Sequence, residues 1–135
     1  MNALETALYE ALTGGTALAA LLAGTASVYN NIAPPGSAFD YVVFNQQVGD
    51  DENMDAHRRV DWRYMVKGIS SVSMAAGGSI AAEIDSLLHA IPLTVSGWTN
   101  IWQRRLSTVR YQEVTAEGEC FYHCGGIYQF RLEKE

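Results

Sequence analysis

Cys120, His123 and Cys124 lie close together near the end of the chain, and thiols and imidazoles are side chains that bind zinc. A tetrahedral zinc site needs a fourth donor, and neither His57 nor His89 stands at the spacing of a zinc finger. Residues four apart in an extended strand are about 13 Å from one another, too far for a disulfide without a bend. We therefore predict two reduced cysteines in a strand and no metal, with a zinc site as the alternative.

Serine, histidine and aspartate are all present, but none stands in a Gly-x-Ser-x-Gly turn or in another recognisable catalytic context. Gly77, Gly78 and Ser79 resemble a phosphate-binding turn before a helix, yet no lysine follows them at P-loop spacing. Paired carboxylates occur in a polar stretch, where water would prevent the separated pKa values that acid–base catalysis requires. We expect no enzyme, no catalytic residue and no cofactor.

That polar stretch, residues 49–57, shows neither helical nor strand periodicity. Its acids are Asp50, Asp51, Glu52 and Asp55. The pattern predicts a hairpin loop longer than the usual length of about two to five residues. Such a loop is either a solvated connector or an assembly arm, disordered in the free subunit and ordered against a neighbour. The arm hypothesis follows from the lack of apolar anchors, because nothing in the loop offsets its own ordering entropy.

Length and charge limit the classes of protein. The chain has 135 residues, which suits a single domain spanning residues 1–135, and its net charge is −6. Proteins that grip phosphate backbones are usually basic, so no specific nucleic-acid binding is expected. No apolar run reaches the roughly 20 residues of a membrane span. Glu5 and Glu10 do not suit a secretory signal, so we expect no membrane partner and synthesis in the cytosol.

The central element predicted from periodicity is an amphipathic helix over residues 79–91, which Pro92 ends. Its apolar stripe consists of Ile80, Ile84, Leu87, Leu88 and Ile91. The helix could begin as early as Ser71 or Ser73, with a glycine pair inside it that allows close packing. Such a stripe must be buried, and neighbouring segments that look like strands predict a sheet beneath it.

Residues 58–68 carry the clearest strand pattern. One face is apolar, with Val60, Trp62, Tyr64 and Val66, and should meet the helix stripe. The other face is mostly polar, and its basic residues are Arg59, Arg63 and Lys67. Because the protein as a whole is acidic, we predict that this basic face is a subunit interface that contacts an acidic neighbour.

The remaining segments complete an α+β fold. Short helices are expected over residues 2–13 and 17–23, a loop over 28–36, and further strands over 39–48, over 101–114 and from 120 onward. Gly125 and Gly126 predict a bulge or bend in the last strand. The predicted order is α-α-β-β-α-β-β, with an antiparallel sheet of about four strands, one long helix across it and two short N-terminal helices.

Several stretches together resemble the small tail-completion, or tail terminator, proteins of long-tailed bacteriophages. The stretches are the Leu-Glu-Thr-Ala-Leu-Tyr-Glu-Ala-Leu-Thr helix, the Ala-Leu-Ala-Ala-Leu-Leu helix, the segment from Val28 through Pro34-Pro35-Gly36 to Val43, the strand from Arg59 to Lys67, and the helix from Ala81 to Leu88. Relatives often have proline where this chain has Asp40 before the tyrosine of the first strand.

The resemblance implies a structural virion protein of a phage or prophage, located in the tail or neck and assembled in the host cytoplasm. It implies a homo-oligomeric ring, typically of six subunits, that caps the tail tube, ends tube polymerisation and offers the interface for head-to-tail joining. The implied partners are the tail tube protein and a head-completion or neck protein, and DNA would pass through the ring without being held. A head-completion or neck adaptor is the main alternative, and a small ligand-binding module or enzyme is the other.

Overall fold

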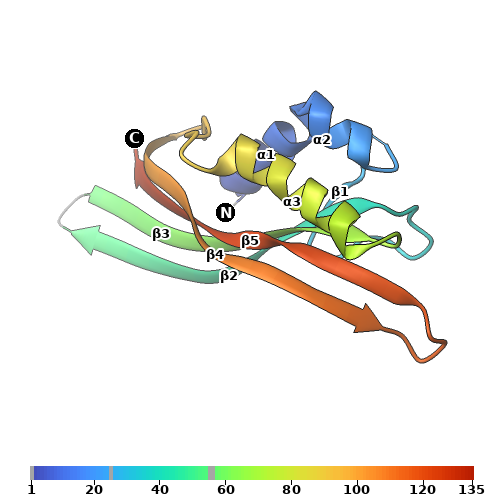
Figure 1. Ribbon diagram of the computed structural model, residues 1–135. Coiled ribbons are helices and arrows are strands. Elements are labelled where there is room, and N and C mark those ends of the chain that lie inside the picture. Colours follow the sequence, from blue (N-terminus) through green and yellow to red (C-terminus); the bar gives the residue numbers. More distant parts are fainter. Residues whose placement is uncertain (1, 25, 55–56) are drawn as a thin grey trace.

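Three helices lie on one face of a five-stranded sheet in the computed structural model of the chain, which describes residues 2–24, 26–54 and 57–135 (Figure 1). The elements in chain order are α1 (Asn2–Gly14), α2 (Thr16–Leu21), β1 (Val28–Asn30), β2 (Tyr41–Met54), β3 (His57–Ser70), α3 (Met74–Leu88), β4 (Trp98–Val114) and β5 (Cys120–Lys134). The α+β class expected from the sequence is confirmed.

The strand order is β1-β2-β3-β5-β4, so the predicted count of about four strands is wrong by one. The additional strand, β1, falls within residues 28–36, which the sequence predicted as a loop. It pairs in parallel with the start of β2, whereas the other neighbouring pairs are antiparallel. A three-residue strand followed by Asn, Pro and Gly is too short to show the alternation by which strands are recognised.

The helix stripe is confirmed at Ile80, Ile84 and Leu88, all of which are fully or almost fully buried. The helix begins after Ser73, whose Oγ accepts a hydrogen bond from the amide of Ala76 at 3.0 Å. It ends at Leu88, so the predicted extension to Ile91 is wrong and that side chain is 51% exposed. The glycine pair does serve close packing, because a Cβ on Gly77 would lie 3.0 Å from the sulfur of Cys124.

Two buried tyrosines of the sheet bind the helices through their hydroxyl groups. Tyr64 of β3 donates a hydrogen bond to Glu5 of α1 at 3.1 Å, and Tyr128 of β5 donates one to Asp85 of α3 at 2.9 Å. Burial is the main cause that raises the pKa of each tyrosine, and the neighbouring carboxylate raises it further. Both hydroxyls therefore stay protonated and act as donors, which sets each helix against a defined point of the core.

Residues 49–54 form the end of β2 and pair with β3 as far as Met54 and His57. The predicted loop over 49–57 is therefore wrong over these residues, while Asp55 lies outside the described residues. A register shift at Gln47 rotates the strand just before the acidic stretch. The acids stand on a paired strand because β3 supplies hydrogen-bonding partners that a local sequence pattern does not reveal.

Of the bulge or bend predicted at Gly125 and Gly126, the bulge is wrong, since β5 has no extra residue against either neighbour there. Register shifts lie instead in β4, at Ile101 and at Leu106. A Cβ on Gly125 would collide with the carbonyl oxygen of Val66 in the neighbouring strand. Glycine is present there because the two backbones approach closely.

Candidate assembly surfaces

The helices leave one face of the sheet uncovered (Figure 1). The basic residues of β3 lie on that face, as strand register and burial show. Alternation along β3 turns Val60 and Tyr64 toward the helices, where both are buried, and turns the intervening residues to the opposite face. The shared face predicted for Arg59, Arg63 and Lys67 is thus confirmed. Their role as a subunit interface remains a prediction.

Two of the three basic residues are held by their own sheet. The Nε atom of Arg59 lies 3.2 Å from Oε2 of Glu133, and Nζ of Lys67 donates a hydrogen bond of 2.8 Å to the hydroxyl of Tyr111. In the part of the chain that the structure describes, the exposed Arg63 has no ion-pair partner. Arg63 is consequently the cation of this set that is most available to another molecule.

Further pairs cross the uncovered face between strands. The Nη2 atom of Arg131 in β5 lies 2.6 Å from Oε2 of Glu52 in β2, spanning β3 between them. The amide of Gln129 donates to Asp61 at 2.7 Å. Partly exposed pairs of this kind each contribute about 0–1 kcal/mol to stability. Their main effect is to hold the long side chains of this face in defined positions.

The acidic residues of β2 lie along an open edge of the sheet. Asp50 and Asp51 are exposed, whereas Glu52 is half-buried by its pairing with Arg131. Among the described residues, β1 pairs with β2 at Val42 to Phe44 only. From residue 45 to 54, β2 pairs with β3 on one side, and its other edge has no strand partner among the described residues. Three of the four acids assigned to the assembly arm thus stand on a strand edge.

The opposite edge of the sheet, β4, is basic and partly apolar. Arg104 lies 4.1 Å above the ring of Trp102, and Nε of Arg105 is 3.6 Å from Asp85. The large apolar side chains exposed on this strand include Ile101 at 45% and Val114 at 62%. A hollow of about 500 Å³ at its start is lined by Arg59, Ile101, Trp102, Arg131 and Glu133. Exposed apolar groups among arginines are typical of protein contact surfaces.

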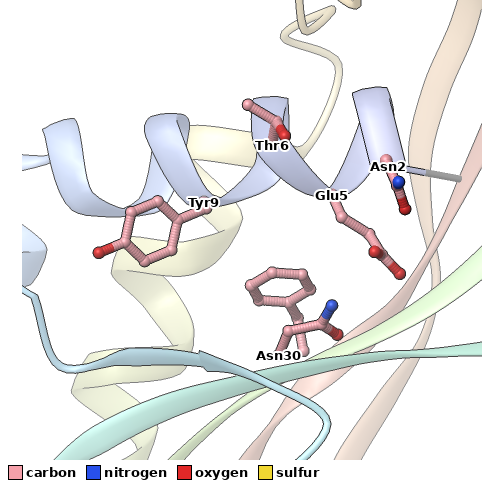
Figure 2. A pocket seen from close by; sticks show the side chains of 6 residues that line it. Asn2, Glu5, Thr6, Tyr9 and Asn30 are labelled. Carbon is pink, nitrogen blue, oxygen red and sulfur yellow. The ribbon is translucent and has the colours of Figure 1, made fainter.

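A second hollow, of about 460 Å³, lies between α1 and the strands β1 and β2 (Figure 2). It is lined by Asn2, Glu5, Thr6, Tyr9, Asn30 and Phe44. Figure 2 shows Glu5 pointing down from α1 toward the strand that carries Asn30, while the ring of Tyr9 lies further along the helix and points away from Asn30. Its carboxylate, Glu5, already accepts the hydroxyl of Tyr64, and no nucleophile stands beside a base among the lining residues.

The strand alternation of β5 separates the residues considered for zinc. His123 lies on the uncovered face, with Nε2 at 2.9 Å from Oε1 of Glu113 and its ring stacked on Tyr111. Cys124 lies on the helix side, with its sulfur 3.3 Å from that of Met74, and both Cys120 and Cys124 are free thiols. In the described part of the chain, no three side chains of His, Cys, Asp or Glu form a potential metal site.

Burial lowers the pKa of His123, and the hydrogen bond to Glu113 opposes that effect. Burial also raises the pKa of the Cys124 thiol. A neutral imidazole and a protonated thiol on opposite faces of a strand are structural groups.

No helix in the described part of the chain has the length and apolar character needed to cross a membrane.

Two polar residues have structural roles that were not predicted from the sequence. Gln103 is buried and donates from Nε2 to the carbonyl oxygens of Leu88 at 2.6 Å and Ile91 at 2.8 Å, which completes the end of α3. Asp40 accepts hydrogen bonds from Ser70 Oγ at 2.9 Å and from the amide of Ser71 at 3.0 Å. Neither role has a local signal, because the partners are remote in sequence.

A family model described as tail completion protein gp17 matches residues 6–119. The chain belongs to this tail completion family. The resemblance seen in the sequence is therefore confirmed, and membership makes the chain a structural tail protein. The match runs from α1 to the turn before β5, so it includes both the acidic edge of β2 and the basic edge of β4.

Solved structures show the same fold. A chain in the virion of a native gene transfer agent (GTA) particle is 21% identical, with a TM-score of 0.77, over 98% of the tail completion protein and 96% of that chain. A second solved chain is 15% identical, with a TM-score of 0.57, over 96% of this chain and 94% of its own length. At these identities the likeness concerns the fold. Among curated proteins, none matches the sequence.

Proposed function

We propose that this tail completion protein assembles into a closed ring of about six subunits at the head-proximal end of the tail tube. The ring ends tube polymerisation and presents the interface for head-to-tail joining. The observation that carries this proposal is the family match over residues 6–119, which covers most of the fold. In the proposed ring each subunit contacts its neighbours, the last ring of tube protein on one side and a head-completion or neck protein on the other.

The uncovered sheet face and the two open edges support the proposal. A head-to-tail contact between different surfaces of identical subunits generates a ring when the rotation closes. The face that carries Arg59, Arg63 and Lys67 is crossed by ion pairs between strands, such as that of Arg131 with Glu52. With a net charge of −6 per subunit, the ring repels DNA, so that the genome passes without being held.

Deletion of the gene from a cell that produces the tailed particles tests the proposal, with tail length and head attachment measured by electron microscopy. Overlong tubes together with unjoined heads support a terminator ring. Tails of normal length that fail to join heads would favour the alternative role of a neck adaptor. Joined particles of normal length and normal number would refute both roles.

Ring formation has its own measurement. The purified protein is mixed with isolated tail tubes, cross-linked and weighed by mass spectrometry. A closed oligomer with a single copy number is expected at the tube end. A stable two-fold dimer under the same conditions would contradict the proposal, because a two-fold contact uses the same surface on both subunits and leaves no surface for growth into a ring.

A further inference from the structure

The two edges of the sheet differ in charge. On the β2 side, Asp50 and Asp51 are exposed and have no ion-pair partner within the described residues. On the β4 side, Arg104, Arg105 and Arg110 are exposed. An open strand edge attracts other strands, and natural proteins control which strand binds by the charges along that edge. Like charges would oppose β2 to β2 or β4 to β4 contact, whereas the acidic edge attracts the basic one.

The directions of the strands suit a head-to-tail contact. Successive antiparallel pairs from β2 through β3 and β5 to β4 make β2 and β4 run in opposite directions within one subunit. A copy generated by rotation about a ring axis therefore brings its β4 antiparallel to β2 of the preceding copy. Antiparallel neighbours need no crossover connection and form the commoner type of strand pair.

The register places the opposite charges at nearly the same height. Across the sheet, Asp50 of β2 pairs with Asp61 of β3, Asp61 pairs with Arg131 of β5, and Arg131 pairs with Trp102 of β4. Asp50 and Trp102 of one subunit therefore stand at the same height along the strands. Arg104 is two positions further along β4 and lies on the same uncovered face as Asp50. A stagger of two residues between copies would thus set Asp50 opposite Arg104, and closed sheets always require some stagger.

The backbone edge of β4 is partly used, because the amide of Arg105 donates to Nδ1 of His89 at 3.2 Å. A continuous ladder of backbone hydrogen bonds cannot form at that point unless His89 moves. The side chains at this height remain exposed, although Nε of Arg104 donates a hydrogen bond of 3.2 Å to Oε1 of Gln129 and its guanidinium lies over the ring of Trp102. The contact at this height therefore relies on side-chain charges.

We propose that a second copy of this chain docks along these edges, with the acidic edge of β2 in one subunit facing the arginines of β4 in the next. This inference rests on the proposed ring and specifies which surfaces close it. It assigns Asp50 and Arg104 as an inter-subunit ion pair. It also differs from the interface predicted from the sequence, which placed Arg59, Arg63 and Lys67 of β3 in the contact.

Charge reversal tests the pairing in cells that lack the chromosomal gene and express a variant. Asp50→Arg and Arg104→Asp are each expected to lower the yield of joined particles by about tenfold or more, because like charges then face each other across every contact. The double variant should restore the yield to within about threefold of the wild type. Three strand spacings and two residues along the strand put the two positions about 16 Å apart within one subunit, so rescue requires a contact between subunits.

Glu10→Arg is the matched control, since it makes the same charge change at an exposed position that lies on helix α1 and not on an edge strand. It should leave the yield unchanged. Each variant is first checked for an unchanged melting temperature. If both folded single variants joined heads as well as the wild type, or if the double variant failed to recover, the assigned pair would be wrong while the proposed ring could still stand. A wild-type gene that is dispensable for tails would instead refute the proposed function.

Cross-linking gives a second measurement that does not depend on charge. In purified particles carrying Asp50→Cys together with Arg104→Cys, oxidation should produce a ladder from dimer up to the closed ring on non-reducing gels. A symmetric contact through either edge would stop at dimers. Functional particles that yield dimers alone, or no cross-link, would overturn the head-to-tail edge contact. Particles with Asp50→Cys alone provide the control for cross-links that involve Cys120 or Cys124.

Discussion

Leu88 closes the core at the C-terminal end of α3, and its replacement by alanine tests how the helix is seated on the sheet. The side chain is fully buried and belongs to the cluster that contains Ile84, Tyr128 and Phe130. Leu88→Ala removes apolar contacts from both layers and leaves a cavity. Because α3 is held at this end by the bond from Gln103 to the carbonyl of Leu88, the backbone has little freedom to collapse into that cavity.

Leucine to alanine changes at buried positions cost about 2–5 kcal/mol, and the upper part of that range applies where the surroundings cannot relax. An unfolding entropy of about 2.1 cal/mol/K per residue gives a shift of about 3.5 °C per kcal/mol for a chain of 135 residues. The melting temperature of Leu88→Ala should therefore fall by about 7–18 °C. Calorimetry and denaturant unfolding followed by circular dichroism measure the two quantities independently.

Leu21→Ala is the matched control, because this leucine is also helical but its side chain is 39% exposed. Its cost should stay within about 0.5 kcal/mol, as for most surface substitutions. The reasoning is refuted if the two variants melt at the same temperature, which would mean that α3 does not bury this face against the sheet. A large loss for Leu88→Ala with an unchanged fold of the native state would support the packing described here.

Three further outcomes are expected from single side chains. Gly125→Ala should lower the melting temperature by at least several degrees, because the added Cβ meets the backbone of β3. Gly14→Ala is the control and should not lower it, because the space around Gly14 is open. Equal melting temperatures of the two variants would contradict the close approach of the strands. Gln103→Leu leaves the carbonyl of Leu88 without its donor and should cost about 1–3 kcal/mol in denaturant unfolding, and a neutral result would show that water replaces the amide. Burial lowers the pKa of His123, so the unfolded chain binds more protons than the folded one; stability from this group is present above pH 6.5 and is lost as the pH falls. Thermal melts from pH 7.5 to 5.5 should therefore show a steeper decline in melting temperature for the wild type than for His123→Gln. Identical slopes would argue against this role of the buried imidazole.

The elements with a long, regular pattern were predictable from the sequence. Ile80, Ile84 and Leu88 recur at helical spacing, and Tyr64 and Val66 alternate along a strand, so each identifies the face that the fold buries. These periodicities are local, because they depend on the geometry of one element and not on its neighbours. The family resemblance depended on the same elements and their order, and for that reason it agreed with the family match.

Tertiary structure alone decided the pairings. β1 is a strand because β2 lies beside it. The acids of residues 50–52 extend β2 because β3 pairs with them, and Glu52 is paired with Arg131, which is 79 residues away in the sequence. The same nonlocal pairing put the acidic and basic edges on opposite sides of the subunit. Strand neighbours are chosen by the global arrangement of the sheet, and a local sequence window contains neither the partner nor its register.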